Sequence, residues 1–403
     1  MNKGEMKRLG DYICEVDVRN RDLEVTNLLG LSMTKQFRPS TSNIVGVDLS
    51  KYKIVHKDVF AFDTMSVIRV HKVPIAINLS KSPIIVSPAY ITFECKDSNI
   101  LNPNYLMMWF SRDEFDRYAD FKSDAAVRGG YNWEELCDTP IYLPPIELQQ
   151  KIVSEYETVT RRIRLNEQII AKLEETAQTL YRKMFVDGID KENLPEGWRM
   201  GIISDFGNVI TGKTPSSEAP EDFGNDMPFI TPGDFQYYNK FAIGSERKLS
   251  TIGYERLKNK ILPNGSVIVT CIGSDMGKVV IASEQCVTNQ QMNSIVVKEK
   301  FYSDYLYYYL SNMKEELKGM ALGSSTMPLL NKSDFEKIAI VIPANDSLYD
   351  FDKKVSPVNK LLELHFKEIY KLKELQSLLL AKMGQGNMVK TQNFASLQRG
   401  DQQ

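Results

Sequence analysis

The sequence predicts an α+β protein with a pseudo-two-fold internal repeat, in which two mixed α/β globular domains are joined by two long helices forming an antiparallel coiled coil. Three observations support this fold class. The chain has 403 residues, and a chain of this length usually forms more than one domain, each with its own hydrophobic core. Short segments recur at an offset of about 199 residues. A long heptad pattern closes each of the two copies.

The internal repeat is visible in two pairs of segments. Asn-Tyr-Leu-Met-Met-Trp-Phe-Ser at residues 104–111 parallels Asp-Tyr-Leu-Tyr-Tyr-Tyr-Leu-Ser at 304–311, and Ile-Tyr-Leu-Pro at 141–144 parallels Ile-Val-Ile-Pro at 340–343. A long helical pattern follows the proline in both copies. The order along the chain is therefore globule, helix, globule, helix.

Both helical patterns keep the 3.5-residue period of a coiled coil for more than four heptads. Nine of the ten a and d positions are apolar in the first pattern and eight of ten in the second. These positions are Ile152, Tyr156, Val159, Ile163, Asn166, Ile170, Leu173, Ala177, Leu180 and Met184, and then Phe351, Val355, Val358, Leu362, His365, Ile369, Leu372, Gln376, Leu379 and Met383. The central a position is polar in both, and we expect Asn166 and His365 to lie close together where antiparallel helices cross. The alternative is two amphipathic helices lying on separate globular cores.

The domain boundaries follow from this order. Residues 1–145 and 186–345 mix short β-branched strands, such as 84–86 and 266–269, with turn signals, and each is expected to form a mixed α/β globule. The long helices are expected at 146–185 and 346–383. Residues 187–198 are predicted to be a linker into the second copy. Residues 384–403 lack an apolar period and are predicted to be a disordered tail.

Composition excludes several classes of protein. Apolar residues make up 42% and charged residues 25%, which is ordinary for a globular protein. Neither a run of ~18 apolar residues nor a signal peptide occurs, so we expect a cytoplasmic protein without membrane contact. The five cysteines are widely spaced and there are only three histidines, which predicts no metal site and no cofactor.

The distribution of charge points to nucleic acid only locally. The net charge of −2 argues against a free-standing nucleic-acid binder, because neutralisation of phosphates normally supplies most of the affinity. Residues 35–81 nevertheless hold eight basic and three acidic side chains, a local charge of +5. One face of the first globule is therefore expected to meet phosphates.

Two segments resemble catalytic motifs but stand in the wrong context. Gly207-Asn-Val-Ile-Thr-Gly-Lys213-Thr214 matches the phosphate-loop pattern, yet Pro215 and Pro220 follow it where a helix should begin. A nucleotide hydrolase using residues 207–214 is the less favoured alternative. Asn102-Pro-Asn-Tyr105 resembles a base-binding motif of adenine methyltransferases, but Asn102 is better explained as a helix N-cap before Pro103. We predict no catalytic residues.

Eight short segments occur in order along the two copies. They are Val45-Gly-Val-Asp-Leu49, Val86-Ser-Pro-Ala-Tyr-Ile-Thr-Phe93, Leu143-Pro-Pro-Ile-Glu-Leu-Gln-Gln-Lys-Ile152, Leu194-Pro-Glu-Gly-Trp198, Ile210-Thr-Gly-Lys-Thr-Pro215, Ile230-Thr-Pro-Gly-Asp234, Cys271-Ile-Gly-Ser274 and Thr288-Asn-Gln-Gln-Met292. Together they resemble the specificity subunit of type I restriction-modification systems, over roughly residues 6 to 383. The N-terminus departs from the pattern because it lacks the Pro-Glu-Gly-Trp entry of the second copy.

The resemblance implies a non-catalytic specificity subunit. Its two globules would be target recognition domains, each reading one half of a bipartite, asymmetric site in double-stranded DNA. Its helices would set the spacing and dock methyltransferase (modification) subunits, and a restriction/translocase subunit would be a further partner. The second helix begins differently from the first, which leaves open whether both helices dock partners equally.

The residues expected to contact DNA are polar and basic side chains in loops. In the first globule they are Lys35, Gln36, Arg38, Ser40, Arg69, Lys72 and Arg128, and in the second Thr211, Lys213, Thr214, Gln236, Tyr237, Ser274, Lys278, Asn289, Gln290, Gln291, Ser325 and Thr326. The competing hypothesis is a protein-binding scaffold whose globules touch no DNA.

Overall fold

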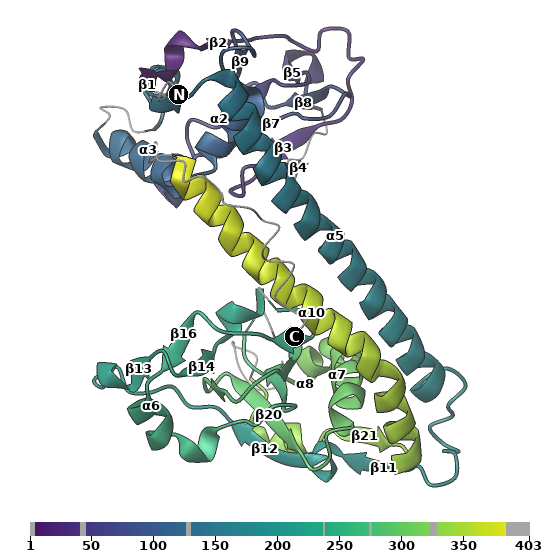
Figure 1. Ribbon diagram of the computed structural model, residues 1–403. Coiled ribbons are helices and arrows are strands. Elements are labelled where there is room, and N and C mark those ends of the chain that lie inside the picture. Colours follow the sequence, from purple (N-terminus) through teal and green to yellow (C-terminus); the bar gives the residue numbers. More distant parts are fainter. Residues whose placement is uncertain are drawn as a thin grey trace, which may run out of the picture. The chain divides into compact units, whose positions relative to one another are not determined.

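The computed structural model describes residues 5–40, 46–125, 130–236, 238–273, 276–321 and 329–383. The chain divides into two compact units, Met1–Arg164 with Tyr370–Gln403, and Leu165–Ile369. Each unit contains one globular head and a part of both long helices, α5 (Ile146–Phe185) and α10 (Asn345–Met383). Head 1 denotes the elements before α5, and head 2 denotes those between α5 and α10 (Figure 1).

Head 1 is built on an antiparallel four-stranded sheet with the order β2-β9-β6-β7. It also contains three separate two-stranded sheets, β1–β10, β3–β4 and β5–β8. Its strands are β1 (Glu5–Arg8), β2 (Ile13–Glu15), β3 (Leu29–Leu31), β4 (Phe37–Pro39), β5 (Lys53–Val55), β6 (Phe60–Phe62), β7 (Ile75–Ile77), β8 (Ile84–Val86), β9 (Ile91–Cys95) and β10 (Pro140–Leu143). Its helices are α1 (Val67–Val70), α2 (Pro103–Phe110), α3 (Asp113–Ala125) and α4 (Trp133–Cys137), with 3-10 turns η1 (Leu9–Asp11) and η2 (Leu49–Lys51).

The alternation of side chains along β6 gives head 1 a core on each face of its sheet. Phe60 and Phe62 point to one face and pack with Phe93 and helix α2, while Ala61 points to the other face and packs with Val55 and its neighbours. The rings of Phe60 and Phe93 stack with centroids 4.8 Å apart. Because both faces are covered, this central strand is apolar throughout.

Head 2 contains a five-stranded sheet, β12-β20-β17-β18-β15, and a four-stranded sheet, β13-β16-β14-β19, besides the pair β11–β21. Its strands are β11 (Arg199–Ile202), β12 (Gly207–Thr211), β13 (Phe223–Gly224), β14 (Met227–Ile230), β15 (Phe241–Ala242), β16 (Arg247–Leu249), β17 (Val267–Thr270), β18 (Val279–Ala282), β19 (Val287–Thr288), β20 (Met292–Val297) and β21 (Ala339–Ile342). Its helices are α6 (Thr251–Arg256), α7 (Tyr302–Asn312), α8 (Lys314–Ala321) and α9 (Lys332–Glu336), with 3-10 turns η3 (Ile203–Asp205), η4 (Pro220–Asp222), η5 (Pro232–Gln236) and η6 (Lys258–Lys260).

The repeat predicted from the sequence is present in the structure. The first and last strands of each head pair antiparallel, β1 with β10 and β11 with β21. Equivalent tyrosines make the same contact: the Tyr105 hydroxyl donates to the carbonyl of Tyr142, and that of Tyr305 donates to the carbonyl of Val341. The predicted N-cap is also confirmed, since Asn102 Oδ1 accepts from the amides of residues 104 and 105 and Pro103 occupies the first turn of α2.

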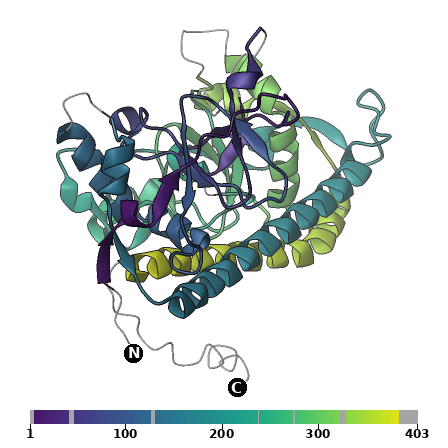
Figure 2. The ribbon, with the colours of Figure 1, turned by 90° about the horizontal axis from the view of Figure 1, so that it is seen from above.

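Helices α5 and α10 pack antiparallel, as predicted, and lie side by side in both views (Figures 1 and 2). Every predicted a and d position is buried or half-buried. The start of α5 and the end of α10 join one core, and the end of α5 joins the start of α10 in another, so residue numbers run in opposite directions. The helix ends therefore also serve the head cores, which combines the predicted pairing with part of its alternative. Residues 384–403, predicted to be a disordered tail, lie outside the described residues.

Candidate nucleic-acid interface

Two loops of head 2 that carry predicted DNA contacts lie against each other. The amide of Lys213 donates to the carbonyl of Thr288 at 2.9 Å. The hydroxyl of Thr214 donates to Gln290 Oε1 at 2.5 Å, and the hydroxyl of Thr211 to Asn293 Oδ1 at 2.7 Å. Residues 211–214 and 288–291 thus form one continuous structure, which we call the head 2 polar surface. It unites six of the residues proposed separately from the sequence: Thr211, Lys213, Thr214, Asn289, Gln290 and Gln291.

Strand pairing explains why these loops meet. Strands β12 and β20 are antiparallel with Thr211 opposite Asn293, so the loop that follows β12 and the loop that precedes β20 emerge at the same edge of the sheet. Gly212 permits the close approach, because a Cβ at this position would lie 2.1 Å from the carbonyl oxygen of Asn289. The Asn289 amide in turn donates to the carbonyl of Ile230 at 3.1 Å, which connects this surface to strand β14.

The phosphate-loop pattern of residues 207–214 does not have the geometry of a phosphate loop. Its first five residues are strand β12, and no helix follows in residues 212–219. The amides of Gly212 and Lys213 donate to the carbonyls of Met292 and Thr288 at 3.2 and 2.9 Å. Since a phosphate loop binds its ligand through such amides, these two are already committed to the protein. The geometry argues against the nucleotide-hydrolase alternative.

Side chains on this surface differ in their exposure. Lys213 and Gln290 are exposed, while Asn289 and Gln291 are half-buried and hydrogen-bonded to each other, Nδ2 to Oε1, at 3.0 Å. Gln236 is exposed at the end of η5. Lys278 is half-buried, and its backbone amide donates to the Thr270 hydroxyl. The other predicted residues of head 2 lie outside the described residues: Tyr237, Ser274, Ser325 and Thr326.

Sequence reasoning missed Asn293, a buried residue that holds this surface in position. Asn293 is 2% exposed, accepts from the Thr211 hydroxyl and donates to the carbonyl of Leu330 at 3.0 Å. It also missed Asp234, which is 2% exposed and accepts from the amide and the hydroxyl of Thr231. Both directly follow or end segments quoted above, but nothing in a single sequence distinguishes a buried positioning residue from a loop residue.

The predicted residues of head 1 fall into three groups: exposed or half-buried residues, residues without a described side chain, and one buried lysine. Gln36 and Arg38 are exposed on the β3–β4 hairpin, Ser40 is half-buried just after it, and Lys72 is exposed beyond α1. Arg69 belongs to α1, its side chain is not described, and Arg128 lies outside the described residues. Lys35 differs from the others because its side chain is only 8% exposed and ion-paired with Asp116 at 2.7 Å. Its ammonium group is therefore occupied inside the head, which weighs against a direct contact with DNA.

The local charge of +5 is also partly neutralised within the head. Lys53 is buried and lies 3.6 Å from Asp17, a residue outside the 35–81 segment. Lys51 and Lys57 pair with Asp48 and Asp58 at 3.8 and 3.7 Å, but these aspartates are already counted in the charge of +5. The buried lysines Lys35 and Lys53 pair with aspartates outside the segment, and these two pairs make it less positive than its composition predicts.

The centre of the helix pair is polar, as predicted. His365 Nδ1 and Asn166 Oδ1 lie 3.0 Å apart, and Asn166 is 1% exposed. Nδ2 of Asn166 is buried without a hydrogen-bond partner. A polar layer of this kind disfavours other alignments of two helices at some cost in stability.

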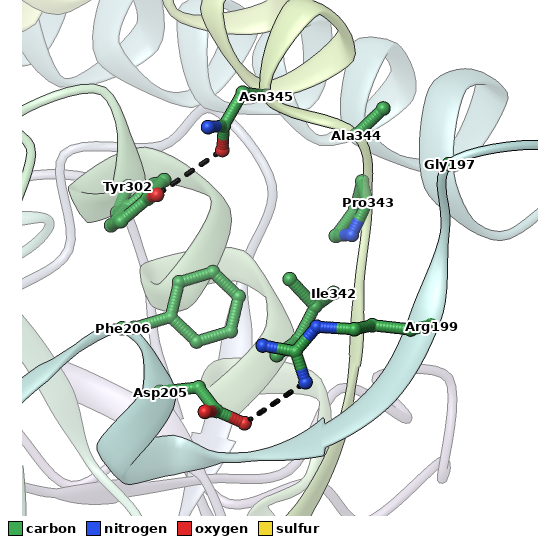
Figure 3. A pocket seen from close by; sticks show the side chains of 9 residues that line it. All are labelled: Gly197, Arg199, Asp205, Phe206, Tyr302, Ile342, Pro343, Ala344 and Asn345. Carbon is green, nitrogen blue, oxygen red and sulfur yellow. Dashed lines mark hydrogen bonds and ion pairs between the residues drawn. The ribbon is translucent and has the colours of Figure 1, made fainter.

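A small pocket in head 2 lies beside the start of α10 (Figure 3). In it Arg199 lies 3.3 Å from Asp205, and the Tyr302 hydroxyl donates to Asn345 Oδ1 at 3.1 Å. The Ile202 amide and the Arg199 guanidinium hold the pKa of the Asp205 carboxyl below its ordinary value. These polar groups satisfy one another, which suits a structural role better than acid-base chemistry.

The described part of the chain contains no group of three or more histidine, cysteine, aspartate or glutamate residues arranged to hold a metal ion. None of its helices combines the length and the apolar character needed to cross a membrane.

Known proteins resemble this chain over most of its length. Residues 8–175 and 195–354 match the family model for the type I restriction modification DNA specificity domain. The specificity subunit of the type I restriction enzyme HindI from Haemophilus influenzae is 27% identical over 377 residues, covering 75% of this chain and 81% of that protein. The MjaIX specificity subunit from Methanocaldococcus jannaschii is 32% identical over 197 residues, covering 45% of each chain.

A solved structure has the same fold. The crystal structure of the type I restriction-modification S subunit from M. genitalium superposes with a TM-score of 0.60 at 12% identity, covering 95% of this chain and 97% of that one. The two matches to the family model correspond to the two copies of the internal repeat and together span more than half of the residues. The chain therefore belongs to the family of type I restriction-modification DNA specificity subunits.

Proposed function

We propose that this chain is the sequence-specific DNA-binding subunit of a type I restriction-modification complex, and that each head reads one half of a bipartite, asymmetric site. The observation that carries the proposal is the head 2 polar surface, residues 211–214 and 288–291, in a chain of this family. Methyl transfer and DNA cleavage are assigned to partner subunits, so the chain itself is non-catalytic.

The chemistry of this surface suits DNA. Glutamine and asparagine amides pair with the edge of adenine, lysine binds phosphate or guanine, and threonine contacts either. Gln290 and Lys213 are exposed, and the hydrogen bond from Thr214 restricts the orientation of Gln290. An oriented amide and an exposed lysine on the same surface would combine base reading with phosphate binding. In head 1 the exposed residues Gln36, Arg38 and Lys72 offer the same types of group, and we assign them the other half-site.

Partner subunits are proposed to dock on the helix pair. Leu165 and Leu364, which are 47% and 60% exposed, are equivalent in the repeat. The two-fold operation that exchanges antiparallel helices keeps equivalent residues on the same side of the pair, so these leucines share a face. Ile169 and Leu361 extend this face by one helical turn each and are 41% and 46% exposed. An exposed apolar patch of this kind indicates a protein partner, which we take to be a methyltransferase subunit.

Shared binding explains the low net charge. A subunit with a charge of −2 gains little affinity from phosphates alone. Docked methyltransferase subunits would contribute further basic groups and the chemistry of methylation. The helix pair would set the spacing between half-sites, because a helix has a fixed rise per residue.

The proposal is tested in cells that express this chain with its methyltransferase subunits. Sequencing of methylated sites should reveal a bipartite motif that disappears when the gene is deleted. Lys213→Ala should weaken binding of the complex to all sequences. It should also make the slope of the logarithm of the binding constant against the logarithm of the salt concentration shallower by about one. Gln290→Ala should relax discrimination at a base of one half-site by roughly ten-fold, the equivalent of one base contact.

Lys191→Ala, at an exposed lysine of the predicted linker, is the matched control and should change neither property. DNA binding and methylation that do not depend on this chain would contradict the proposal. A complex that assembles normally but shows no shift of specific DNA would support the scaffold alternative.

A further inference from the structure

A buried ion pair ties the β3–β4 hairpin of head 1 to its helices. Lys35 occupies the hairpin turn with a φ of 58°, and its ammonium lies 2.7 Å from Asp116 Oδ1 on α3. It also donates to the carbonyl of Phe110 at the end of α2. The same carboxylate oxygen accepts from the amide of Val73 at 3.0 Å. One aspartate therefore holds both the hairpin and the segment just after Lys72, the two places where head 1 is expected to contact DNA.

Head 2 contains a second lysine of this kind. Lys240 follows η5 and precedes β15, is 0% exposed, and lies 2.5 Å from Asp304 Oδ1 on α7. Its ammonium also donates to Asn359 Oδ1 on α10 at 2.8 Å and to the Tyr308 hydroxyl at 3.3 Å. Asn359 Nδ2 returns a hydrogen bond to Asp304 Oδ2 at 2.8 Å. The segment that carries Gln236 is thus anchored to two helices at once.

We propose that Lys35 with Asp116 and Lys240 with Asp304 are positioning pairs, which aim the DNA-reading loops of their own head without touching DNA. This inference rests on the proposed function of the chain. The two pairs are not related by the repeat, since the residue equivalent to Asp304 is Asn104. The same device therefore occurs at unrelated positions, in each case between a reading loop and a helix.

Stability alone is a poor explanation for these pairs. The free energy needed to transfer two charges out of water offsets much of the free energy gained from their attraction. Apolar side chains of similar size often stabilise a core equally well. Burial lowers the pKa of both lysines despite the neighbouring aspartates, which reflects this cost. Apolar side chains, however, do not impose one particular orientation on a loop. Lys35 reaches two oxygens on different helices, and Asp116 reaches both Lys35 and a backbone amide, so the hydrogen bonds define one loop orientation.

The experiment removes the charges of one pair at a time. Lys35→Met/Asp116→Asn leaves no buried charge unpaired, and the amide at position 116 can still accept from Val73. Lys240→Met/Asp304→Asn is the matched variant in head 2, where the amide at position 304 can still bind Asn359. Each full-length chain is co-expressed with its methyltransferase subunits, methylated sites are sequenced, and the melting of the purified chain is recorded.

We expect each variant to melt within a few degrees of the wild type and to lose roughly ten-fold in base discrimination at one half-site only, a different one for each variant. Unchanged half-sites in a folded variant would overturn the inference, as would relaxation of both half-sites by one variant. Loss of the folded head would also overturn it, because the pair would then be required for folding rather than for aiming. Absence of any bipartite motif with the wild-type chain would instead refute the proposed function itself.

Discussion

Replacement of the polar layer in the helix pair should change stability with a sign that depends on which residue is removed. Asn166→Leu takes away a buried Nδ2 that has no partner, and an unsatisfied donor of this kind costs about 1 to 3 kcal/mol. It sacrifices one hydrogen bond to His365, worth about 1 kcal/mol, but His365 is 16% exposed and can bind water instead. His365→Leu alone leaves the whole Asn166 amide buried without a partner. The first variant should therefore be more stable than the wild type and the second less stable.

The double variant Asn166→Leu/His365→Leu should be about 2 kcal/mol more stable, since it removes the unsatisfied donor and adds an apolar layer. For a cooperative unit of ~200 residues this corresponds to a rise of roughly 4 to 8 °C in melting temperature. Differential scanning calorimetry of the full chain at several concentrations measures this rise and detects self-association. A His365→Leu variant as stable as the wild type would refute the reasoning, because Asn166 would then not depend on His365.

Exchanging residues 1–145 for the equivalent part of a relative should change one half of the methylated motif and leave the other intact; a change in both halves would contradict independent reading. A heptad inserted after Leu173, with another after Leu372, lengthens each helix by about 10 Å and should widen the gap between half-sites by about three base pairs. An unchanged gap in the sequenced sites would show that the helices do not set the spacing. Burial raises the pKa of the Glu174 carboxyl, so its ionised form is disfavoured in the folded chain, and Glu174→Gln should raise the melting temperature at pH 7. This gain should vanish as the pH falls below the ordinary value of 4.5, where the carboxyl is protonated in both states. Leu364→Glu should weaken copurification of methyltransferase subunits while leaving the melting temperature within about 2 °C, because Leu364 is 60% exposed.

Features with a short period were predictable from the sequence. The heptads of α5 and α10 place apolar side chains at a spacing that only paired helices bury well, and the polar layer followed because both patterns share one centre. The Asn102 cap followed from residues within one turn. Strands were predicted at 84–86 and 266–269 in the same way, from short β-branched runs, and the structure has them at 84–86 and 267–270.

The roles of individual lysines were not predictable. Lys35 and Lys213 both stand in polar loops with turn-forming neighbours, and the sequence places both among the DNA contacts. The structure pairs Lys35 with a carboxylate 81 residues away and leaves Lys213 exposed. Local composition contains no information about a partner so distant, because folding of the chain brings the two together.

The sequence by itself therefore determined the repeat, the fold class, the helix pair and the family, since each depends on periodicity or on the order of short segments. Tertiary structure alone decided which loops meet and which of their groups remain available. Residues 207–214 match a phosphate loop letter by letter, but the carbonyls of Thr288 and Met292 occupy the amides that a phosphate would need. Hydrogen bonds between strands distant in sequence, rather than the motif, determine what such a loop can bind.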